Sequence, residues 1–229
     1  MGSGPIRRQV ARYLRQRGEL EGPHLFLGDL TRAEILKLAG KVSRTDSPRD
    51  LESDYDALRQ DALSCRKCSL ARTRTQVVFS DGNPEARLMV VGEAPGARED
   101  ETGLAFVGPA GKLLDLLLGA VDLSRESSAY ICNVLKCRPP GNRNPLPQEI
   151  EACTPYLRRQ IEVVAPEAIL AVGTFSAQFL TGQNRALGQL RGEVYSYQGV
   201  PLVVTYHPAA LLRNPGWTRA TWDDLQLLR

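Results

Sequence analysis

The sequence contains no long apolar segment. No stretch of its 229 residues approaches the roughly 20 apolar residues that a transmembrane helix needs. The N-terminus also lacks the apolar core of a secretory signal peptide. We therefore expect a protein without membrane spans that works in the cytoplasm.

The chain also carries almost no net charge. The chain has 29 Lys and Arg residues against 26 Asp and Glu residues, which leaves a formal net charge of +3 at pH 7. Nucleic-acid binding depends on a local basic surface rather than on a basic total, so this balance neither supports nor excludes such a partner. With 42% hydrophobic and 24% charged residues, the composition is that of a globular protein.

The chain is predicted to consist of two parts. Residues 1–55 form a helical appendage and linker, with helix-like pieces at Ile6–Arg17 and Leu30–Ala39, and residues 56–229 form the functional domain. The five arginines of the first piece are compatible with phosphate contacts, but a solvated helix face is the more common outcome. We assign the appendage no catalytic role.

Short apolar runs alternate with helical patterns from about residue 86 onward. This alternation predicts an α/β fold, a mostly parallel sheet with helices on both faces. The predicted strands are Arg87–Val91, Ala129–Leu135, Ala168–Val172 and Leu202–Tyr206, with an extra pair around Glu193–Gln198. The predicted helices are Ala110–Val121, Pro147–Val164, Phe175–Leu180 and Thr218–Leu228.

Polar residues and glycines follow the predicted strands. Ligands of parallel sheets bind beyond the carboxyl ends of the strands. At those positions stand Gly92–Gly96, Asn133, Gly173 with Thr174, and His207, which is one of two histidines. A carboxylate, an amide, glycines and an imidazole are therefore predicted to meet at one edge of the sheet.

Each of these features alone also has an ordinary structural interpretation. Gly92–Gly96 is compatible with a plain strand-to-loop turn, and a lone histidine is more often structural than catalytic. The segment His207–Pro215 shifts that balance, because it places Leu211 and Leu212 in a proline-bounded loop. A protein seldom gains from exposing two adjacent leucines unless they insert into something.

Four of the five cysteines can close a metal site. Cys65 and Cys68 form a C-x2-C knuckle, and Cys137 and Cys153 follow further along the chain. Without an export signal a disulfide framework is a poor explanation, and four thiolates suit structural zinc and a [4Fe–4S] cluster alike. Cys132 lies within a predicted strand and is best explained as a small buried apolar residue.

The motifs from Cys65 to Pro215 together resemble those of the family 4 uracil-DNA glycosylases. In order they are the C-x2-C knuckle, Gly92–Gly96, Phe106–Lys112, Asn133–Arg143, Cys153 and His207–Pro215. The resemblance implies excision of uracil from single- or double-stranded DNA in base-excision repair. It also implies a [4Fe–4S] cluster, with zinc as the less favoured occupant, held by Cys65, Cys68, Cys137 and Cys153.

The uracil pocket is expected to consist of a small set of side chains. An extruded uracil would stack on Phe106 close to Gly92 and Ala94, while the Asn133 amide accepts from N3–H and donates to O4. Cytosine presents the opposite pattern, and mispairing costs on the order of 1–3 kcal/mol per buried group. By resemblance, Glu99 walls off the methyl group of thymine.

Cleavage leaves a cationic sugar and a uracil anion. His207 would donate a hydrogen bond to uracil O2, an interaction typically worth roughly 10²–10³ in rate. Glu93 would position or activate water, or offset the positive charge of the sugar. The family 1 enzymes have an aspartate where Ala94 stands, so this sequence departs from their pattern beside Glu93.

Duplex DNA requires a side chain that fills the space left by the extruded nucleotide. Leu211 is the predicted wedge by its place in the loop, with Leu212 and Arg213 as neighbours that intrude or bind phosphate. Lys112, at the start of a predicted helix, is a candidate phosphate ligand, although simple helix capping explains that position equally well.

Two rival functions remain open at this point. A non-catalytic uracil-DNA binder would have the same pocket with a misplaced base. A structural zinc protein would explain the cysteines but not the combination of Phe106, Asn133 and His207. We expect a monomer, because one chain suffices for the site, with downstream repair proteins as further partners.

Overall fold

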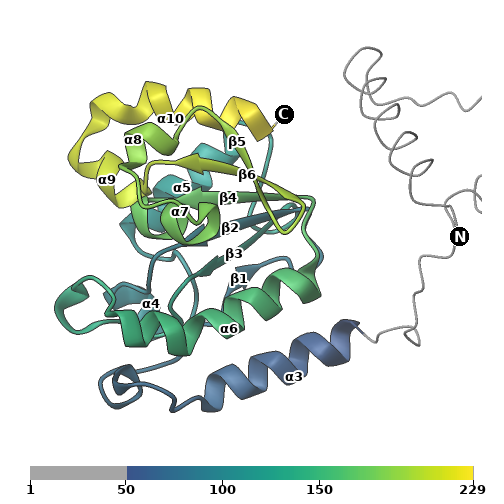
Figure 1. Cartoon of the computed structure of the whole chain (residues 1–229), viewed down its shortest axis with the longest axis vertical. Coiled ribbons are helices and arrows are strands. Elements are labelled where there is room, and N and C mark those ends of the chain that lie inside the picture. Colours follow the sequence, from purple (N-terminus) through teal and green to yellow (C-terminus); the bar gives the residue numbers. More distant parts are fainter. Residues whose placement is uncertain (1–50, 229) are drawn as a thin grey trace, which may run out of the picture. The chain divides into compact units, whose positions relative to one another are not determined.

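A six-stranded sheet forms the centre of the structure, a computed structural model that describes residues 51–228 (Figure 1). The strands are β1 (Asp81–Gly82), β2 (Leu88–Gly92), β3 (Ala129–Asn133), β4 (Ala168–Val172), β5 (Val194–Tyr197) and β6 (Val200–Thr205). Their order is β1-β3-β2-β4-β6-β5. The four central strands are parallel and the two edge strands pair antiparallel, which confirms the predicted mostly parallel sheet.

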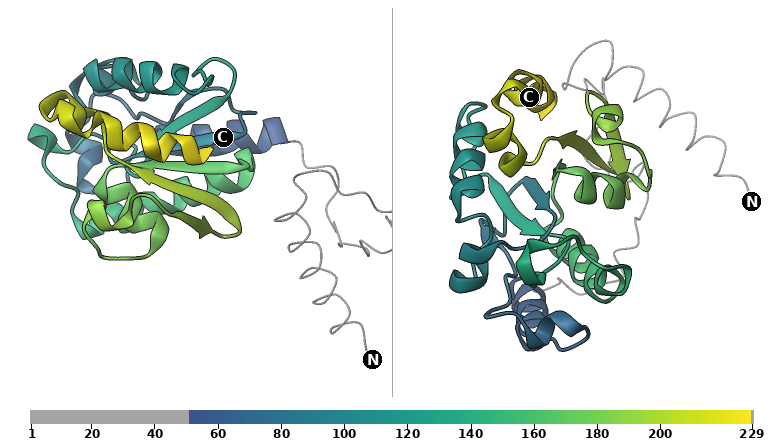
Figure 2. Two further views of the ribbon diagram at one scale, coloured as in Figure 1. Left: turned by 90° about the horizontal axis from the view of Figure 1, so that it is seen from above. Right: turned by 90° about the vertical axis from the view of Figure 1, so that its left-hand side faces the viewer.

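Helices cover both faces of this sheet, as predicted. The longer ones are α3 (Leu51–Ser64), α5 (Pro109–Gly119), α6 (Pro147–Val164), α7 (Thr174–Thr181) and α10 (Thr218–Leu225). The short ones are α4 (Ala97–Thr102), α8 (Leu187–Leu190), α9 (Pro208–Arg213), and the 3-10 turns η1 (Ser69–Arg72), η2 (Pro140–Asn142), η3 (Pro215–Trp217) and η4 (Gln226–Leu228). Figure 2 shows the sheet between α5 with α10 on one side and α7 with α8 on the other.

The alternation of side chains along β2 explains the layers. Met89 and Val91 pack in one core cluster with residues of α6 and α7. Leu88 and Val90 pack in a second cluster with residues of α5 and α10. Because both faces of the strand are covered, every position is apolar rather than every second one.

The start of α6 follows directly from its sequence. Pro147 occupies the first turn, where its missing N–H is not needed. Glu149 accepts a hydrogen bond from the N–H of Leu146 at 2.9 Å, and Arg143 pairs with the same buried carboxylate at 2.6 Å, which lowers the pKa of Glu149. This pair fixes the loop before α6, the helix that carries Cys153.

The predicted domain boundary falls inside a helix. A boundary after residue 55 would cut α3, which spans Leu51–Ser64. α3 packs along α6 (Figure 1), where Arg159 pairs with Asp54 at 3.6 Å. The helix therefore belongs to the functional domain rather than to a linker.

The two predicted helix-like pieces of the appendage, Ile6–Arg17 and Leu30–Ala39, lie outside the described residues. Within residues 51–228, none of the helices combines the length and the apolar character needed to cross a bilayer.

Candidate active site

A cleft of about 750 Å³ opens beyond the carboxyl ends of the parallel strands. Its lining includes Glu93, Asn133, Gly173 and His207, which lie at or just beyond the ends of β2, β3, β4 and β6 respectively. The parallel register places Gly92 opposite Asn133, so the two strands end level with each other. The predicted meeting of these residues at one sheet edge is confirmed.

Gly92 makes room for two of the predicted pocket residues. A Cβ atom at this position would overlap both the Oδ1 atom of Asn133 and the ring of Phe106. Glycine is therefore required so that the amide and the aromatic ring can approach the same strand end. Phe106 and Ala94 also line the cleft, as their assignment to the pocket requires.

The Phe106 ring is positioned through its backbone. Its φ of 54° is uncommon for a bulky residue, and such strain persists only where the surroundings impose it. Arg125 donates to the carbonyls of Phe106 at 2.7 Å and Ala105 at 2.8 Å, and pairs with Asp81 at 2.6 Å. A Cβ at Gly111 would overlap the Phe106 backbone, so α5 begins directly against this turn.

Glu99 joins two loops of the cleft. Its Oε1 accepts from the N–H groups of Val107 at 2.9 Å and Gly108 at 2.8 Å, and its Oε2 accepts from Gly96 at 3.1 Å. The side chain is buried and lines the cleft. Oε1 therefore orients the loop that follows Phe106, whereas Oε2 fixes the loop before α4. The exclusion of the thymine methyl group stays a prediction.

Asn133 places an unsatisfied acceptor at the cleft wall. The residue is 2% exposed, and its Oδ1 has no hydrogen-bond partner among the described residues. An unpaired buried polar atom costs about 1–3 kcal/mol, so a donor on a bound ligand is the natural explanation. Its backbone carbonyl accepts from the Nζ of buried Lys136 at 2.6 Å, which fixes Asn133 from behind.

His207 follows β6 and caps α9. Its Nδ1 accepts from the N–H of Ala209 at 3.1 Å, so the neutral ring carries its proton on Nε2. Burial, and next the charge of Arg213, lower the pKa of His207 to about 4. The ring stacks against Phe106 with centroids 5.5 Å apart, and a Cβ at Gly173 would press on it.

Glu93 lines the same cleft with its carboxylate unengaged. Its backbone carbonyl accepts from the N–H of Leu135 at 3.0 Å, but within residues 51–228 the carboxylate forms no hydrogen bond or ion pair. Burial raises the pKa of Glu93. The site thus contains one carboxylate, at Glu93, that is free to act on a ligand, since the oxygens of Glu99 are occupied.

Leu211, the predicted DNA wedge, is buried in the structure. The segment after His207 forms α9 instead of a loop, and α9 packs against α5. Adjacent helical residues point about 100° apart, and here Leu211 faces inward at 3% exposure whereas Leu212 faces outward at 52%. Of the two leucines, Leu212 is the one available on the surface.

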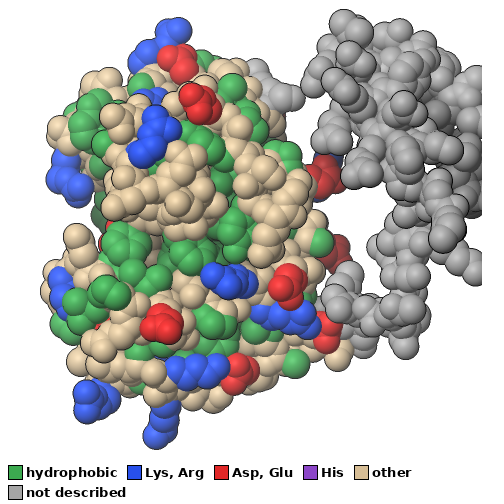
Figure 3. Space-filling view, viewed as in Figure 1, with side chains coloured by type: hydrophobic (Ala, Val, Ile, Leu, Met, Phe, Trp, Pro, Cys, Tyr) green, Lys and Arg blue, Asp and Glu red, His purple; other side chains and the backbone are tan. Residues whose placement is uncertain are grey.

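The candidate DNA-contacting cations differ in their placement. Arg213 lines the cleft, whereas Lys112 is exposed on the first turn of α5 and does not line it. Figure 3 shows Lys and Arg side chains interspersed with Asp and Glu on one face of the molecule. Of these two candidate cations, Arg213 is therefore the one that lies at the cleft.

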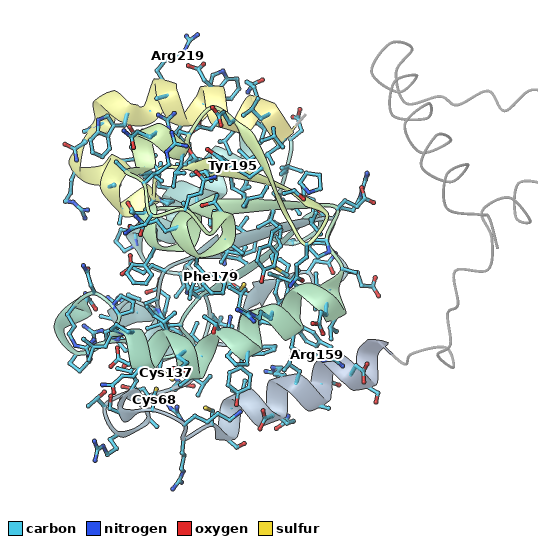
Figure 4. All side chains as sticks on the ribbon, in the orientation of Figure 1. Cys68, Cys137, Arg159, Phe179, Tyr195 and Arg219 are labelled. Carbon is cyan, nitrogen blue, oxygen red and sulfur yellow. The ribbon has the colours of Figure 1, made fainter. Side chains whose placement is uncertain are left out.

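The four cysteines predicted to bind a metal line one cavity. Cys65 and Cys68 come from the turn between α3 and η1, Cys137 from the loop after β3, and Cys153 from α6. Figure 4 labels Cys68 and Cys137, which lie together below α6 in that view. Cys132 is fully buried in the main core, as predicted.

Hydrogen-bond donors point at two of the sulfur atoms. Arg74 donates to the Sγ of Cys137 at 3.2 Å, and the backbone N–H of Lys136 donates to the Sγ of Cys153 at 3.2 Å. Burial raises the pKa of Cys137 and raises the pKa of Cys153 to about 11. In the described part of the chain, no three Cys, His, Asp or Glu side chains converge on the position of a single ion.

Sequence reasoning missed several residues of the cleft. Arg143, Tyr206 and Trp217 all line it. Tyr206 had a usable signal, because it directly precedes His207 at a strand end. No sequence signal pointed to Trp217, because its place at the cleft depends on the direction in which α9 leads the chain.

Comparison with known proteins identifies the family. Residues 79–226 match the model of the uracil DNA glycosylase superfamily. A type-4 uracil-DNA glycosylase of Archaeoglobus fulgidus is 44% identical over 173 residues, which covers 72% of this chain and 86% of the relative. One from Thermotoga maritima is 45% identical over 152 residues, covering 66% and 79%, and a type-5 enzyme of Pyrobaculum aerophilum is 34% identical over 152 residues, covering 59% and 66%. The chain therefore belongs to the type-4 uracil-DNA glycosylases.

Proposed function

We propose that this protein hydrolyses the N-glycosidic bond of deoxyuridine in DNA, which releases uracil and leaves an abasic site for base-excision repair. The observation that carries the proposal is the shared cleft of Phe106, Asn133 and His207, with the buried Asn133 Oδ1 lacking a partner. The type-4 relatives support the same activity. We propose further that the protein acts as a monomer in the cytoplasm on single- and double-stranded DNA.

Base recognition requires that the uracil nucleotide first leave the stack, at a cost of a few kcal/mol. In the cleft the Phe106 ring provides a stacking surface. The Oδ1 of Asn133 accepts from uracil N3–H, and its amide nitrogen donates to O4. Cytosine has an acceptor at N3 and an amino group at C4, so both contacts would be mispaired, each at about 1–3 kcal/mol.

A neutral His207 suits the leaving group. With a pKa lowered to about 4, the ring is uncharged at pH 7, and α9 occupies Nδ1 rather than Nε2. The Nε2 proton is therefore available to uracil O2 as negative charge develops there. One such preorganised donor is typically worth roughly 10²–10³ in rate.

Glu93 acts on the sugar side of the bond. Its carboxylate has no partner in the described protein, so it can orient a water molecule or offset the positive charge of the sugar. Burial raises the pKa of Glu93, which means that the anion is poorly stabilised until positive charge develops beside it. Ala94 contributes no carboxylate, so Glu93 carries this role alone.

We propose that the cysteine cavity holds an iron–sulfur cluster rather than a single zinc ion. Four thiols line one cavity, yet no three of them converge on one point within residues 51–228, and N–H donors already point at two sulfurs. When bound, a [4Fe–4S] group would cross-link the turn after α3, the loop after β3 and α6. Its ligands would be Cys65, Cys68, Cys137 and Cys153.

A single-turnover glycosylase assay tests the function. We expect abasic product from uracil-containing single and double strands, and none from matched strands with cytosine or thymine. Tight binding of uracil-DNA without product would identify a non-catalytic binder instead.

Metal analysis of anaerobically purified protein tests the cluster. We expect about four irons per chain and a broad visible absorbance. Zinc without iron would refute the iron–sulfur cluster, but it would not contradict the proposed glycosylase activity.

A further inference from the structure

An aromatic pair lies at the rim of the cleft and has no part in the proposed chemistry. Tyr206 follows β6 and Trp217 ends η3, and their rings stack with centroids 4.5 Å apart at an interplanar angle of 16°. Both residues line the cleft. Trp217 is nevertheless 40% exposed, so much of the indole stays open to solvent while Tyr206 covers one face.

Buried polar contacts support this pair from behind. The guanidinium carbon of Arg191 lies 4.2 Å from the centroid of the Tyr206 ring, and its Nε donates to Asp224 at 2.7 Å. Asp224 is 1% exposed and also accepts from the hydroxyl of Thr205 at 2.6 Å. These bonds fix Arg191 and, through it, the tyrosine ring on which the indole rests.

Core packing does not explain Trp217. The other tryptophan, Trp222, is partly buried against the core cluster of α5 and α10, whereas Trp217 belongs to no core cluster of the described residues. Its backbone is anchored on both sides, because its N–H donates to Asn214 at 3.1 Å and its carbonyl accepts from Thr221 at 3.1 Å. A fixed backbone therefore presents an open indole face.

Cations accompany the indole in the cleft. Arg143 and Arg213 line the same cleft as Trp217. Aromatic faces combined with positive charge along one groove are what proteins use to bind single-stranded nucleic acid, since bases stack on the rings and phosphates approach the cations. The chemistry of this rim matches an unpaired nucleotide.

We propose that Trp217 is a stacking platform for one unpaired nucleobase of the substrate strand, next to the extruded deoxyuridine. This rests on the proposed function, because the uracil in the cleft brings its neighbour to the rim. Every nucleobase has a π-face, so the platform accepts any base. In a duplex the neighbouring base is already stacked and paired, so the platform favours single strands.

Tryptophan fluorescence tests the contact directly. The chain has two tryptophans, so Trp222→Phe leaves Trp217 as the reporter. The probe is a single-stranded oligonucleotide with 2′-fluoro-2′-deoxyuridine, whose fluorine disfavours the cationic sugar and so prevents cleavage. We expect saturable quenching that disappears when abasic residues flank the uridine. Binding of the base-bearing probe with unchanged fluorescence would overturn the proposal.

The affinity of Trp217 variants gives a second measurement. Trp217→Ala should weaken binding of the base-bearing probe about five- to a hundredfold, and Trp217→Phe should retain most of the affinity. Both variants should bind the abasic-flanked probe as the wild type does. The difference in quenching between the wild type and Trp217→Phe provides the same readout with Trp222 in place.

A parallel excision assay on the wild type separates the two proposals. Normal uracil release with unaltered binding by Trp217→Ala would refute the platform alone. Absence of uracil release and of probe binding by the wild type would refute the function and the platform together.

Discussion

The cleft at the strand ends and the cysteine cavity are built in different ways. In the cleft, the protein's own hydrogen bonds orient the functional groups: Glu99 accepts from three backbone N–H groups, and Arg125 fixes the turn of Phe106. In the cysteine cavity, four thiols come from separate segments, and donors from Arg74 and Lys136 reach two of them. The cleft is preorganised by contacts within the protein, whereas we propose that the cavity is completed by the group that it binds.

Lys136 connects the two regions. Its Nζ donates to the Asn133 carbonyl, and its backbone N–H donates to the Sγ of Cys153. The side chain is 2% exposed and has no carboxylate partner within residues 51–228. A buried ammonium group is costly unless negative charge lies near it. The cysteines would provide that charge only when a bound group keeps them deprotonated, because burial alone raises the pKa of Cys137 and Cys153.

The largest expected effect is on stability, from Cys153→Ser. Loss of one ligand should lower the free energy of unfolding by at least about 4 kcal/mol, as loss of a bound metal does, while the excision rate per folded molecule changes little. Thermal unfolding and a rate normalised to the folded fraction measure the two. Cys132→Ser is the matched control outside the cavity. Equal destabilisation by both variants would mean that the cavity cysteine contributes no more to stability than an ordinary buried cysteine.

The reverse pattern is expected for His207→Ala. Single-turnover excision should fall roughly 10²–10³-fold, because a preorganised donor to the leaving group is lost. Affinity for uracil-DNA should stay largely intact, since the contact strengthens mainly in the transition state. Unchanged excision would remove His207 from the mechanism.

Selectivity should relax in Asn133→Asp. If the buried carboxyl is neutral, its O–H donates to cytosine N3 and its carbonyl accepts from the amino group. The ratio of uracil to cytosine excision should fall roughly 5- to 160-fold, which corresponds to about 1–3 kcal/mol. Parallel assays on matched uracil and cytosine strands measure that ratio. An unaltered ratio would mean that another group reads the base edge.

The decline of the excision rate at low pH should be caused by protonation of Glu93. Because burial raises its pKa, Glu93 takes up a proton as the pH falls, before an ordinary glutamate does, and excision declines with loss of the carboxylate. His207, with a pKa lowered to about 4, stays neutral through that range. Single-turnover rates across pH should show this decline in the wild type and a flat, lower profile in Glu93→Gln. A decline that persists in Glu93→Gln would assign it elsewhere.

The smallest effect is expected for the exposed leucine of α9. Leu212→Ala should slow excision from duplexes roughly tenfold, about 1.5 kcal/mol for one leucine side chain, and leave single strands unaffected. Leu211→Ala should instead lower stability, by about 2–5 kcal/mol for a buried leucine, and affect both substrates alike. A duplex-specific loss in Leu211→Ala at equal folded fraction would identify Leu211 as the wedge instead.

Local patterns were sufficient for the four parallel strands but not for the short edge strand β1 or for the segments around the sheet. The strand Ala168–Val172 and the helix Pro147–Val164 have the predicted bounds, because apolar runs and an N-terminal proline are local signals. The whole of α3 was missed, because its mixed polar sequence forms a helix in packing against α6. α9 was predicted as a loop, because two prolines and an asparagine suggested one.

The sequence by itself determined which residues meet. Strands that are apolar on both faces indicate a parallel sheet covered by helices. The carboxyl ends of parallel strands lie at the same edge of the sheet, so the backbones of Glu93, Asn133 and His207 come together there. Tertiary structure alone decided the directions of those side chains. The inward turn of Leu211 and the stacking of Trp217 on Tyr206 depend on how α9 and η3 pack against other segments, a non-local contact that no short stretch of sequence encodes.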